Sequence, residues 1–283
     1  MVCEAVKDVA LGDFLRARRA SLAPDEGEVT SAPLRRVPGL RREEVARLVG
    51  VSVDYYVKLE QGHRIPSEGV LHSLAEVLQL DQAAREHMRN LAWRDSQPNR
   101  HPGSTAQHVR PGMFRLMESF GGLPVVLLGR RTDILAANPT ARLLFADFNA
   151  MPAHERNAIR FALLSERARE LHLDWESIVA GFAGMLRMDA GRHPDDPRTA
   201  ELINDLCSRS RYFARVWSGY HVATSVVPES KLIEHPVVGR VRFQVEAVTT
   251  PQDPDQVLQV LFPASDPASQ SAARDLLALA GVK

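Results

Sequence analysis

The sequence predicts two folded parts: an all-α N-terminal bundle, followed by an α+β domain. Three observations predict this division. Apolar residues recur at helical spacing through about the first 90 residues. A polar stretch with three prolines and two glycines then runs from Asp95 to Gly112, as in linkers between domains. Beyond it, short β-rich runs flank a helical section. We therefore expect domains at residues 1–95 and 113–283, joined by a linker at 96–112.

Five short helices are expected in the N-terminal part. In the first, Leu11, Phe14, Leu15 and Leu22 form one apolar stripe. A polar stretch with prolines and glycines follows at 24–39. The other four helices are expected at 42–49, after a cap at Ser52, after Ser67 and from Asp81 onward. Helices this short form a compact bundle without room for a large pocket.

Residues 41–62 carry the pattern of two helices joined by a tight turn. Gly50 permits the positive φ that such a turn requires. Ala46 is small where the second helix crosses the first, and Val51 fills the corner. Ser52 can cap the second helix by accepting a hydrogen bond from its exposed N–H groups. The pattern predicts a helix-turn-helix, whose second helix can enter the major groove of double-stranded DNA.

The expected DNA-binding residues lie at the start of the first of these helices and on the outward side of the second. They are Arg41, Arg42, Ser52, Val53, Asp54, Tyr55, Val57 and Lys58. Arg42 and Lys58 are the expected main contacts to phosphates or bases. Tyr55 could equally belong to the core, and Asp54 to the solvated surface. Glu43 and Glu44 are expected to stabilise the helix N-terminus, and Glu60 to pair within the domain.

Charge alone does not identify a nucleic-acid-binding protein here. The formal net charge is zero at pH 7. Between Arg16 and Arg64 there are ten Arg and Lys against seven Asp and Glu, a mild excess. The prediction of DNA binding therefore depends on the placement of residues within 41–62.

The C-terminal part is expected to have strands at both ends and helices between them. A β-rich run at 124–129 precedes 134–145, a strand that leads into a helix through Asn138 and Pro139. Asp196 and Pro197 are a good cap and first residue for a helix. The expected helices are 158–170, 175–190, 198–208 and one introduced by 266–269. The later strand-like runs are 222–227, 231–233, 239–249 and 256–262.

The helix-turn-helix resembles that of the XRE (lambda-repressor-like) family. The match covers residues 40–62, with Ala46, Gly50-Val51-Ser52, Leu59-Glu60 and Gly62 at the positions where that family has them. It continues through Pro66-Ser67 into Leu74-Ala75. The resemblance implies a lambda-repressor-like bundle for the N-terminal part.

Over nearly its full length the chain resembles the MmyB-like regulators. The strings that carry the resemblance are residues 11–19, 35–46, 55–62, 156–161, 174–176, 191–197 and 231–239. The resemblance implies a C-terminal PAS-like domain that binds a fatty-acid-like ligand. The order of two strands, helices and a three-strand meander agrees with a PAS-like fold. One departure is Tyr220-His221-Val222 after Trp217, where the family usually has His-Asp-Val.

Two groups of residues are candidates for ligand binding. Trp175, Phe182, Met185 and Leu186 fall on one helical face, and they either line a cavity or form ordinary core. Together with Trp217 and Phe243 they are our candidates for an acyl-binding slot. Arg156 and Arg160, at i and i+4, either clamp an anionic head group or form salt bridges within the domain.

Motifs of the common enzyme classes are missing. The sequence has no P-loop, GxGxxG, HExxH or GxSxG motif, so we expect a protein without catalytic activity or a cofactor. His193, Asp195 and Asp196 could suggest a metal site, but a capped turn is the favoured interpretation, and no metal is expected. Cys3 and Cys207 lack the spacing of a disulfide framework or zinc site and suit a reducing cytoplasm. No apolar run is long enough to span a membrane.

These observations favour a cytoplasmic, homodimeric transcription regulator. Its expected partners are double-stranded DNA and a small apolar or fatty-acid-like molecule, and no membrane insertion is expected. Two alternatives stay open. The chain could be an enzyme or cofactor-bearing redox sensor with an appended DNA-binding module, or a ligand-free DNA-binding protein whose C-terminal domain dimerises.

Overall fold

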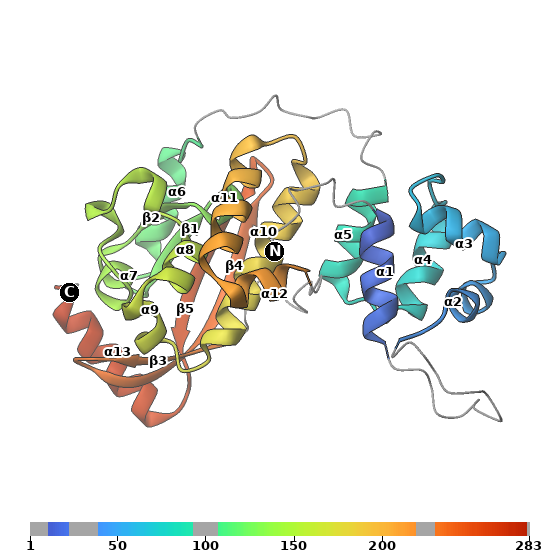
Figure 1. Ribbon diagram of the computed structural model, residues 1–283. Coiled ribbons are helices and arrows are strands. Elements are labelled where there is room, and N and C mark those ends of the chain that lie inside the picture. Colours follow the sequence, from blue (N-terminus) through green and yellow to red (C-terminus); the bar gives the residue numbers. More distant parts are fainter. Residues whose placement is uncertain (1–10, 23–38, 93–106, 219–229, 282–283) are drawn as a thin grey trace.

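A computed structural model describes residues 11–22, 39–92, 107–218 and 230–281 (Figure 1). The N-terminal part is a helical bundle, and the C-terminal part is an α+β domain built on a five-stranded antiparallel sheet. The two-part fold class predicted from the sequence is confirmed at this level. None of the helices within the described ranges is long and apolar enough to cross a membrane.

Residues 11–22 and 39–92 of the N-terminal bundle form five helices at the expected positions. They are α1 (Leu11–Ser21), α2 (Arg42–Val49), α3 (Val53–Glu60), α4 (Glu68–Val77) and α5 (Gln82–Ala92). The predicted caps are confirmed: the Ser52 hydroxyl accepts from the Tyr55 N–H at 3.1 Å, and the Ser67 hydroxyl from the Val70 N–H. Gly50, with φ of 79°, ends α2 in the left-handed conformation. A Cβ at Gly12 would lie 2.0 Å from the Glu60 carbonyl oxygen, so α1 and α3 cross in direct backbone contact.

The sheet has the order β2-β1-β5-β4-β3, with every pair antiparallel. Its strands are β1 (Val125–Leu128), β2 (Ile134–Ala137), β3 (Ser230–His235), β4 (Gly239–Thr250) and β5 (Asp253–Pro263). These match the expected runs, except that 222–227 lies outside the described residues. Two of these strands precede the mainly helical residues 139–218, and three follow them.

Eight helices and three short 3₁₀ turns complete the described part of the C-terminal domain. The helices are α6 (Pro111–Ser119), α7 (Pro139–Leu144), α8 (Ala158–Leu164), α9 (Glu166–Leu171), α10 (Trp175–Arg192), α11 (Pro197–Arg209), α12 (Arg211–Ser218) and α13 (Pro267–Leu279). The 3₁₀ turns are η2 (Arg130–Thr132), η3 (Phe148–Ala150) and η4 (Ala153–Glu155). Helices α6 and α12 were not expected. The expected helix at 158–170 is wrong as one unit, because Ser165 is extended and its hydroxyl caps α9 through the Ala168 N–H.

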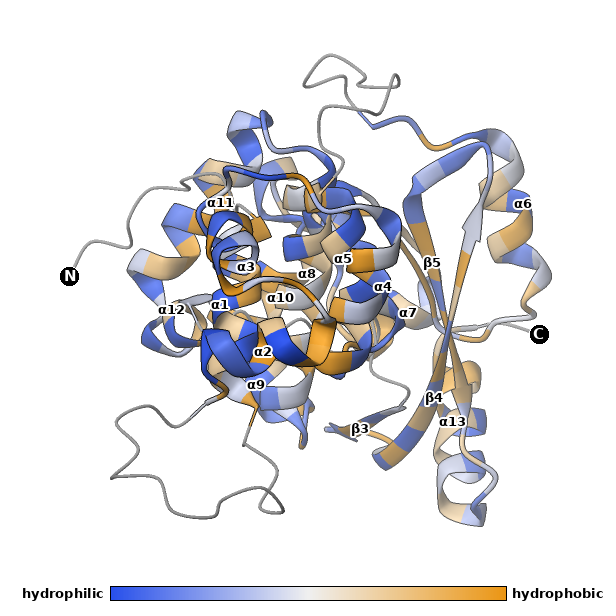
Figure 2. Cartoon of the chain, turned by 90° about the vertical axis from the view of Figure 1, so that its right-hand side faces the viewer, coloured by the Kyte–Doolittle hydropathy of each residue, from blue (hydrophilic) through white to orange (hydrophobic). Residues whose placement is uncertain are grey.

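Both faces of the sheet are covered. Val126 and Leu128 of β1 belong to the main core, which includes residues of α8 and α10. Val125 and Leu127 point to the other face, where they pack with Met113 of α6. Figure 2 shows α6 and the α8–α10 layer on opposite sides of the strands. All four residues of β1 are therefore buried, which accounts for its continuous apolar run, since a strand covered on both faces has no solvent side.

Candidate DNA interface and ligand pocket

The first turn of α3 is exposed at the surface of the bundle. Arg41, Arg42, Ser52, Val53 and Asp54 are exposed, whereas Tyr55, Val57 and Lys58 are half-buried. The eight expected DNA-binding residues therefore all lie on α3 or at the start of α2, two helices that pack together. Tyr56 and Leu59 are fully buried and form the core side of α3. The DNA-binding role of the eight residues stays a prediction.

Lys58 and Arg42, the two main expected DNA contacts, form ion pairs that differ in burial: the partner of Lys58 is exposed and that of Arg42 is buried. Lys58 Nζ donates to Asp54 Oδ2 at 2.7 Å on the exposed surface of α3. Arg42 Nε donates to Glu60 Oε2 at 2.7 Å, and Arg19 Nε donates to Oε1 of the same carboxylate at 2.8 Å. Glu60 is buried, so it pairs within the domain, as predicted. An exposed pair such as Lys58–Asp54 is worth little and can be exchanged for a phosphate, whereas Arg42 also helps to hold α2 against α3.

The loop after α3 was missed by the sequence analysis as a DNA-facing candidate. His63, Arg64 and Ile65 are exposed, Ile65 to 68% of its area. Gly62 has φ of 74° and turns the chain at the end of the recognition helix. The signal was present in the sequence, since a basic residue, Arg64, follows that turn within a few residues.

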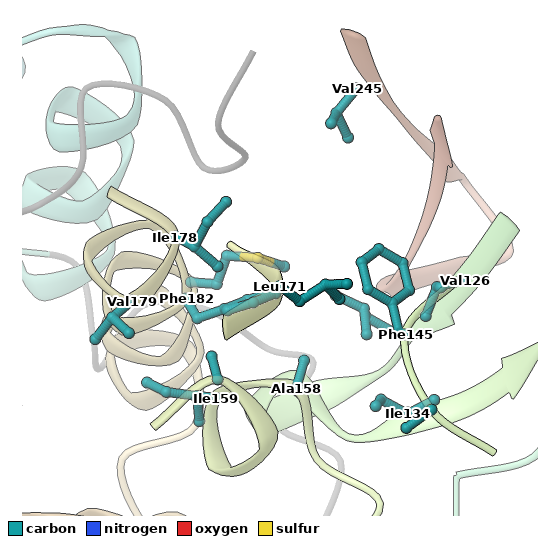
Figure 3. Close-up of a cluster of buried hydrophobic side chains, with 14 of the residues drawn as sticks. Val126, Ile134, Phe145, Ala158, Ile159, Leu171, Ile178, Val179, Phe182 and Val245 are labelled. Carbon is teal, nitrogen blue, oxygen red and sulfur yellow. The ribbon is translucent and has the colours of Figure 1, made fainter. Parts of the chain in front are cut away.

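A small cavity of about 30 Å³ lies between the sheet and the helices that cover it. Figure 3 shows the surrounding apolar cluster, with Ile178 and Phe182 of α10 on one side and Val126 and Ile134 of the sheet on the other. Nine of the twelve lining residues are apolar, and the other three are polar. They are Val126, Leu128, Ile134, Phe145, Phe148, Ala158, Phe161, Ala162, Phe182, His172, Lys231 and Gln259. The cavity is thus an apolar space with a few polar groups, as in binding sites for small molecules.

The polar part of the wall centres on Lys231. This side chain is 4% exposed, and Nζ donates to Gln259 Oε1 at 3.2 Å. Its ammonium also lies over the rings of Phe145 and Phe182, at 5.7 and 5.5 Å from their centroids. Burial lowers the pKa of Lys231 to about 8, against a smaller opposing effect of Asp174. Burial, and then the charge of Lys231, lower the pKa of His172 to about 3, so the imidazole is neutral at physiological pH.

Only one of the expected ligand-binding residues, Phe182, lines this cavity. Met185 lies just behind the wall, with Sδ 4.0 Å from Gln259 Nε2, while Leu186 and Phe243 are fully buried in the same core. Trp175 and Trp217 lie at the edge of that core. Trp175 Nε1 donates to the Ala162 carbonyl at 2.6 Å, and Trp217 stacks on Phe213.

Arg156 and Arg160 are not among the lining residues, and the helical spacing used to group them does not apply. Asn157 is the N-cap of α8, so Arg156 lies before the helix. Arg156 donates to the Met151 carbonyl at 2.8 Å, and Arg160 pairs with Asp205. Their role as a clamp stays a prediction. The sequence analysis missed Lys231, whose position was signalled by alternation: Lys231, Ile233 and His235 are buried in β3, while their neighbours point outward.

The C-terminal half of α10 contacts the N-terminal bundle (Figure 1). Met188 is 5% exposed and packs into the apolar core of the bundle. Arg192 pairs with Glu86 of α5 at 2.5 Å. His87 of α5 is fully buried, and none of the residues that the structure describes forms a hydrogen bond with its ring nitrogens. Burial lowers its pKa to about 3, helped by the charges of Arg187, Arg18 and Arg192.

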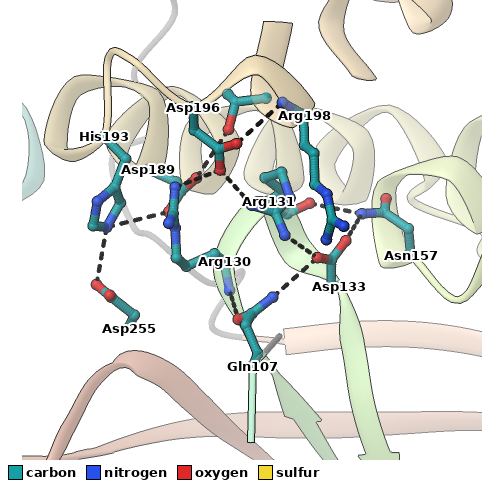
Figure 4. Close-up of polar contacts among 11 residues, drawn as sticks. Gln107, Arg130, Arg131, Asp133, Asn157, Asp189, His193, Asp196, Arg198 and Asp255 are labelled. Atoms are coloured by element: carbon teal, nitrogen blue, oxygen red, sulfur yellow. Dashed lines mark hydrogen bonds and ion pairs between the residues drawn. The ribbon is translucent and has the colours of Figure 1, made fainter. Parts of the chain in front are cut away.

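A polar network fixes the same part of α10 to the sheet domain (Figure 4). Arg130 donates to Asp189 of α10 at 3.3 Å and to Asp196 at 2.6 Å, and Arg131 donates to Asp196 at 2.5 Å. Asp196 also caps α11 by accepting from the Arg198 N–H, which confirms the predicted capped turn. Helix α10 therefore contributes Phe182 to the cavity wall, pairs with the β1–β2 connection through Asp189, and packs on the N-terminal bundle through Met188.

Comparison with known families assigns both parts of the chain. A family model described as the MmyB-like transcription regulator ligand binding domain matches residues 109–277. A model described as a helix-turn-helix domain matches residues 10–88. No curated protein matches the chain.

Proposed function

The chain belongs to the family with an MmyB-like transcription regulator ligand binding domain, and from this we propose that it is a sequence-specific DNA-binding regulator of the XRE type, controlled by a fatty-acid-like ligand. The helix-turn-helix domain suggests DNA as one partner, and the ligand-binding domain suggests a small molecule as the other. Both families are transcription regulator domains and not enzymatic ones. In this proposal DNA contacts come from residues 41–58, and the ligand enters the cavity beside α10.

The observation that carries the proposal is the position of α10. Phe182 lines the cavity, and about two turns further along the same helix Met188 packs into the core of the DNA-binding bundle. A cavity of about 30 Å³ has room for about two water molecules and is far too small for an acyl chain. A ligand must therefore displace part of the wall. Displacement on the α10 side would be transmitted to the bundle, because protein cores are close-packed and deform little.

Such an arrangement supplies the two states that regulation requires. A ligand shifts DNA affinity only by its differential affinity for two conformations. The arrangement with the small cavity of about 30 Å³ and α10 packed on α5 is one of them. In the other, the ligand occupies an enlarged cavity and α10 has moved relative to α5. We propose that these two arrangements present α3 to DNA differently.

Several features support a fatty-acid-like ligand and a PAS-like domain. The sheet order β2-β1-β5-β4-β3, with helices between β2 and β3 along the chain, agrees with a PAS-like fold. The cavity wall is mostly aliphatic and aromatic. A chain of 12 to 16 carbons would gain roughly 0.8 kcal/mol for each buried methylene, before the costs of ordering it and of opening the cavity. We further propose domains at 1–95 and 113–283, a linker at 96–112, and a homodimer, since helix-turn-helix dimers read two half-sites.

Native mass spectrometry of the purified full-length chain tests the ligand. We expect a bound adduct with the mass of a fatty acid or a similar lipid, or binding of added dodecanoic acid at micromolar concentration. If no adduct copurifies and the added acid does not bind, the ligand-sensing part of the proposal is overturned. DNA binding is measured separately, by selection of sites from a random DNA pool, and failure to enrich any sequence would overturn the DNA-binding part.

A further inference from the structure

The cavity wall contains one cation among the residues that the structure describes, Lys231. The chain has only four lysines, and this one is buried among phenylalanine rings. Among the described residues, its side-chain hydrogen bond goes to the Gln259 amide and not to a carboxylate. Asp174 acts on it only through space. Burying an ammonium group without a carboxylate partner is unfavourable, so its position calls for a source of negative charge.

Two further polar groups beside Lys231 lack a strong partner. Gln259 accepts from Lys231 through Oε1. Within the described part of the chain its Nε2 donates only to the Met185 thioether, 4.0 Å away, and a thioether is a weak acceptor. His172 Nδ1 is buried and has no hydrogen-bond partner among the described residues. The three side chains come from β3, β5 and the end of α9, and all three line the cavity. Lys231 Nζ, Gln259 Nε2 and the neutral His172 ring can each donate a hydrogen bond.

We propose that these residues bind the carboxylate of the ligand, with Lys231 as its counter-ion and Gln259 and His172 as further donors. The ligand is then a monocarboxylic acid whose apolar tail lies along the aliphatic and aromatic part of the wall. This inference rests on the proposed function, because it requires the cavity to bind a ligand. It adds the chemistry of the head group and assigns that chemistry to residues outside the arginine pair suggested by the sequence.

The competing explanation is that Lys231 is purely structural. Its bond to Gln259 and its contacts with Phe145 and Phe182 would then suffice to hold a buried ammonium. The two explanations differ in one measurable respect. A structural lysine gives no preference between a carboxylic acid and an alcohol of the same chain length, whereas a counter-ion does.

The test is calorimetric titration of the full chain with dodecanoic acid and with dodecan-1-ol. The variants are Lys231→Met, whose side chain is unbranched and apolar, and the control Arg240→Met, which removes a positive charge on the exposed surface of β4. For the native chain and Arg240→Met we expect the acid to bind about 10- to 100-fold more tightly than the alcohol, the range of a hydrogen bond to a charged group. Lys231→Met should bind both with the affinity of the alcohol.

The outcomes distinguish failure of the ligand-sensing function from failure of the head-group assignment. If neither compound binds the native chain, the ligand-sensing function fails. If both bind the native chain equally, or if Lys231→Met keeps the preference for the acid, the head-group assignment fails while the function survives.

A second measurement needs no variant and covers the case in which Lys231→Met does not fold. Free Lys231 loses its proton near pH 8, while His172 is already neutral and Asp174 faces it as the nearby acidic group. Affinity for the acid should therefore fall above pH 8, by up to about tenfold per pH unit, and affinity for the alcohol should stay constant. An acid affinity that is unchanged between pH 7 and 10 overturns the assignment.

Discussion

Gly191 of α10 lies directly against the imidazole of His87 of α5. A Cβ built on Gly191 would lie 3.0 Å from both Nδ1 and Cε1 of the His87 ring. The edge of the same ring packs on Phe14, with centroids 5.3 Å apart. The contact between the DNA-binding bundle and the ligand-binding domain thus depends on the absence of a side chain at one position of α10.

Replacing Gly191 by Val should weaken the contact between the two parts of the chain. The added side chain meets the buried ring of His87, which also packs against Phe14. We expect a larger radius of gyration by small-angle scattering. The matched control is Gly69→Val in α4, where an added Cβ meets nothing within 4 Å. An unchanged radius of gyration and an unchanged ligand effect on DNA binding would show that this contact transmits nothing.

Acid should weaken the same contact through His87. Its pKa is about 3 in the folded chain and about 6.5 when unfolded, so only the unfolded chain takes up this proton between those values. The stability contributed by neutral, buried His87 is present above pH 6.5 and is lost as pH falls, by about 1.4 kcal/mol per unit. The difference in free energy of unfolding between His87→Leu and the native chain should grow by that amount per unit below pH 6.5. A difference that is constant from pH 7 to 5 would contradict the burial of a neutral histidine.

Lys58 should contribute a phosphate contact. Replacing it by Ala frees Asp54 at little cost to stability, because the pair is exposed. In a plot of log affinity against log salt concentration, measured with nonspecific duplex DNA, the slope should shrink by about 0.9. Arg240→Ala, which removes an exposed arginine of β4 paired with Glu234, is the control and should leave the slope unchanged. An unaltered slope in Lys58→Ala removes this residue from the DNA interface.

A substitution at Met185 of α10 tests whether the ligand occupies the cavity. The Met185 sulfur contacts Gln259, so Met185→Trp should fill the space that the acid needs and abolish binding of dodecanoic acid. DNA binding by the N-terminal bundle should persist. Overpacking a core costs about 1–3 kcal/mol, so circular dichroism must first establish that the variant folds. Retained acid binding, or loss of the fold, would identify Met185 as ordinary core.

The local features of the fold could be predicted from the sequence because their causes are local. Ser52, Gly50 and Asp196 act on their own backbone or on residues within a few positions, so their spacing alone predicts a helix boundary. The break at Ser165 was missed because the apolar spacing on both sides of it is compatible with one continuous helix.

The polar part of the cavity could not be predicted in the same way. Lys231, Gln259 and His172 come together through the register of the sheet and the packing of α9 on β3. The spacing of residues along the sequence does not predict these contacts. The alternation of β3 indicated that Lys231 points inward, but not what it would meet there. For Arg156 and Arg160 the difficulty was local, since helical spacing was applied across Asn157, which starts the helix.

The central claim, that α10 couples the cavity to the DNA-binding bundle, is tested most directly by DNA affinity with and without bound ligand. Fluorescence anisotropy with a DNA site selected by the protein should show a change in Kd of at least about fivefold at saturating dodecanoic acid. The same DNA should change the affinity for the acid by the same factor, because coupling between two binding sites is reciprocal. An identical Kd for DNA with the cavity occupied and empty would contradict the account.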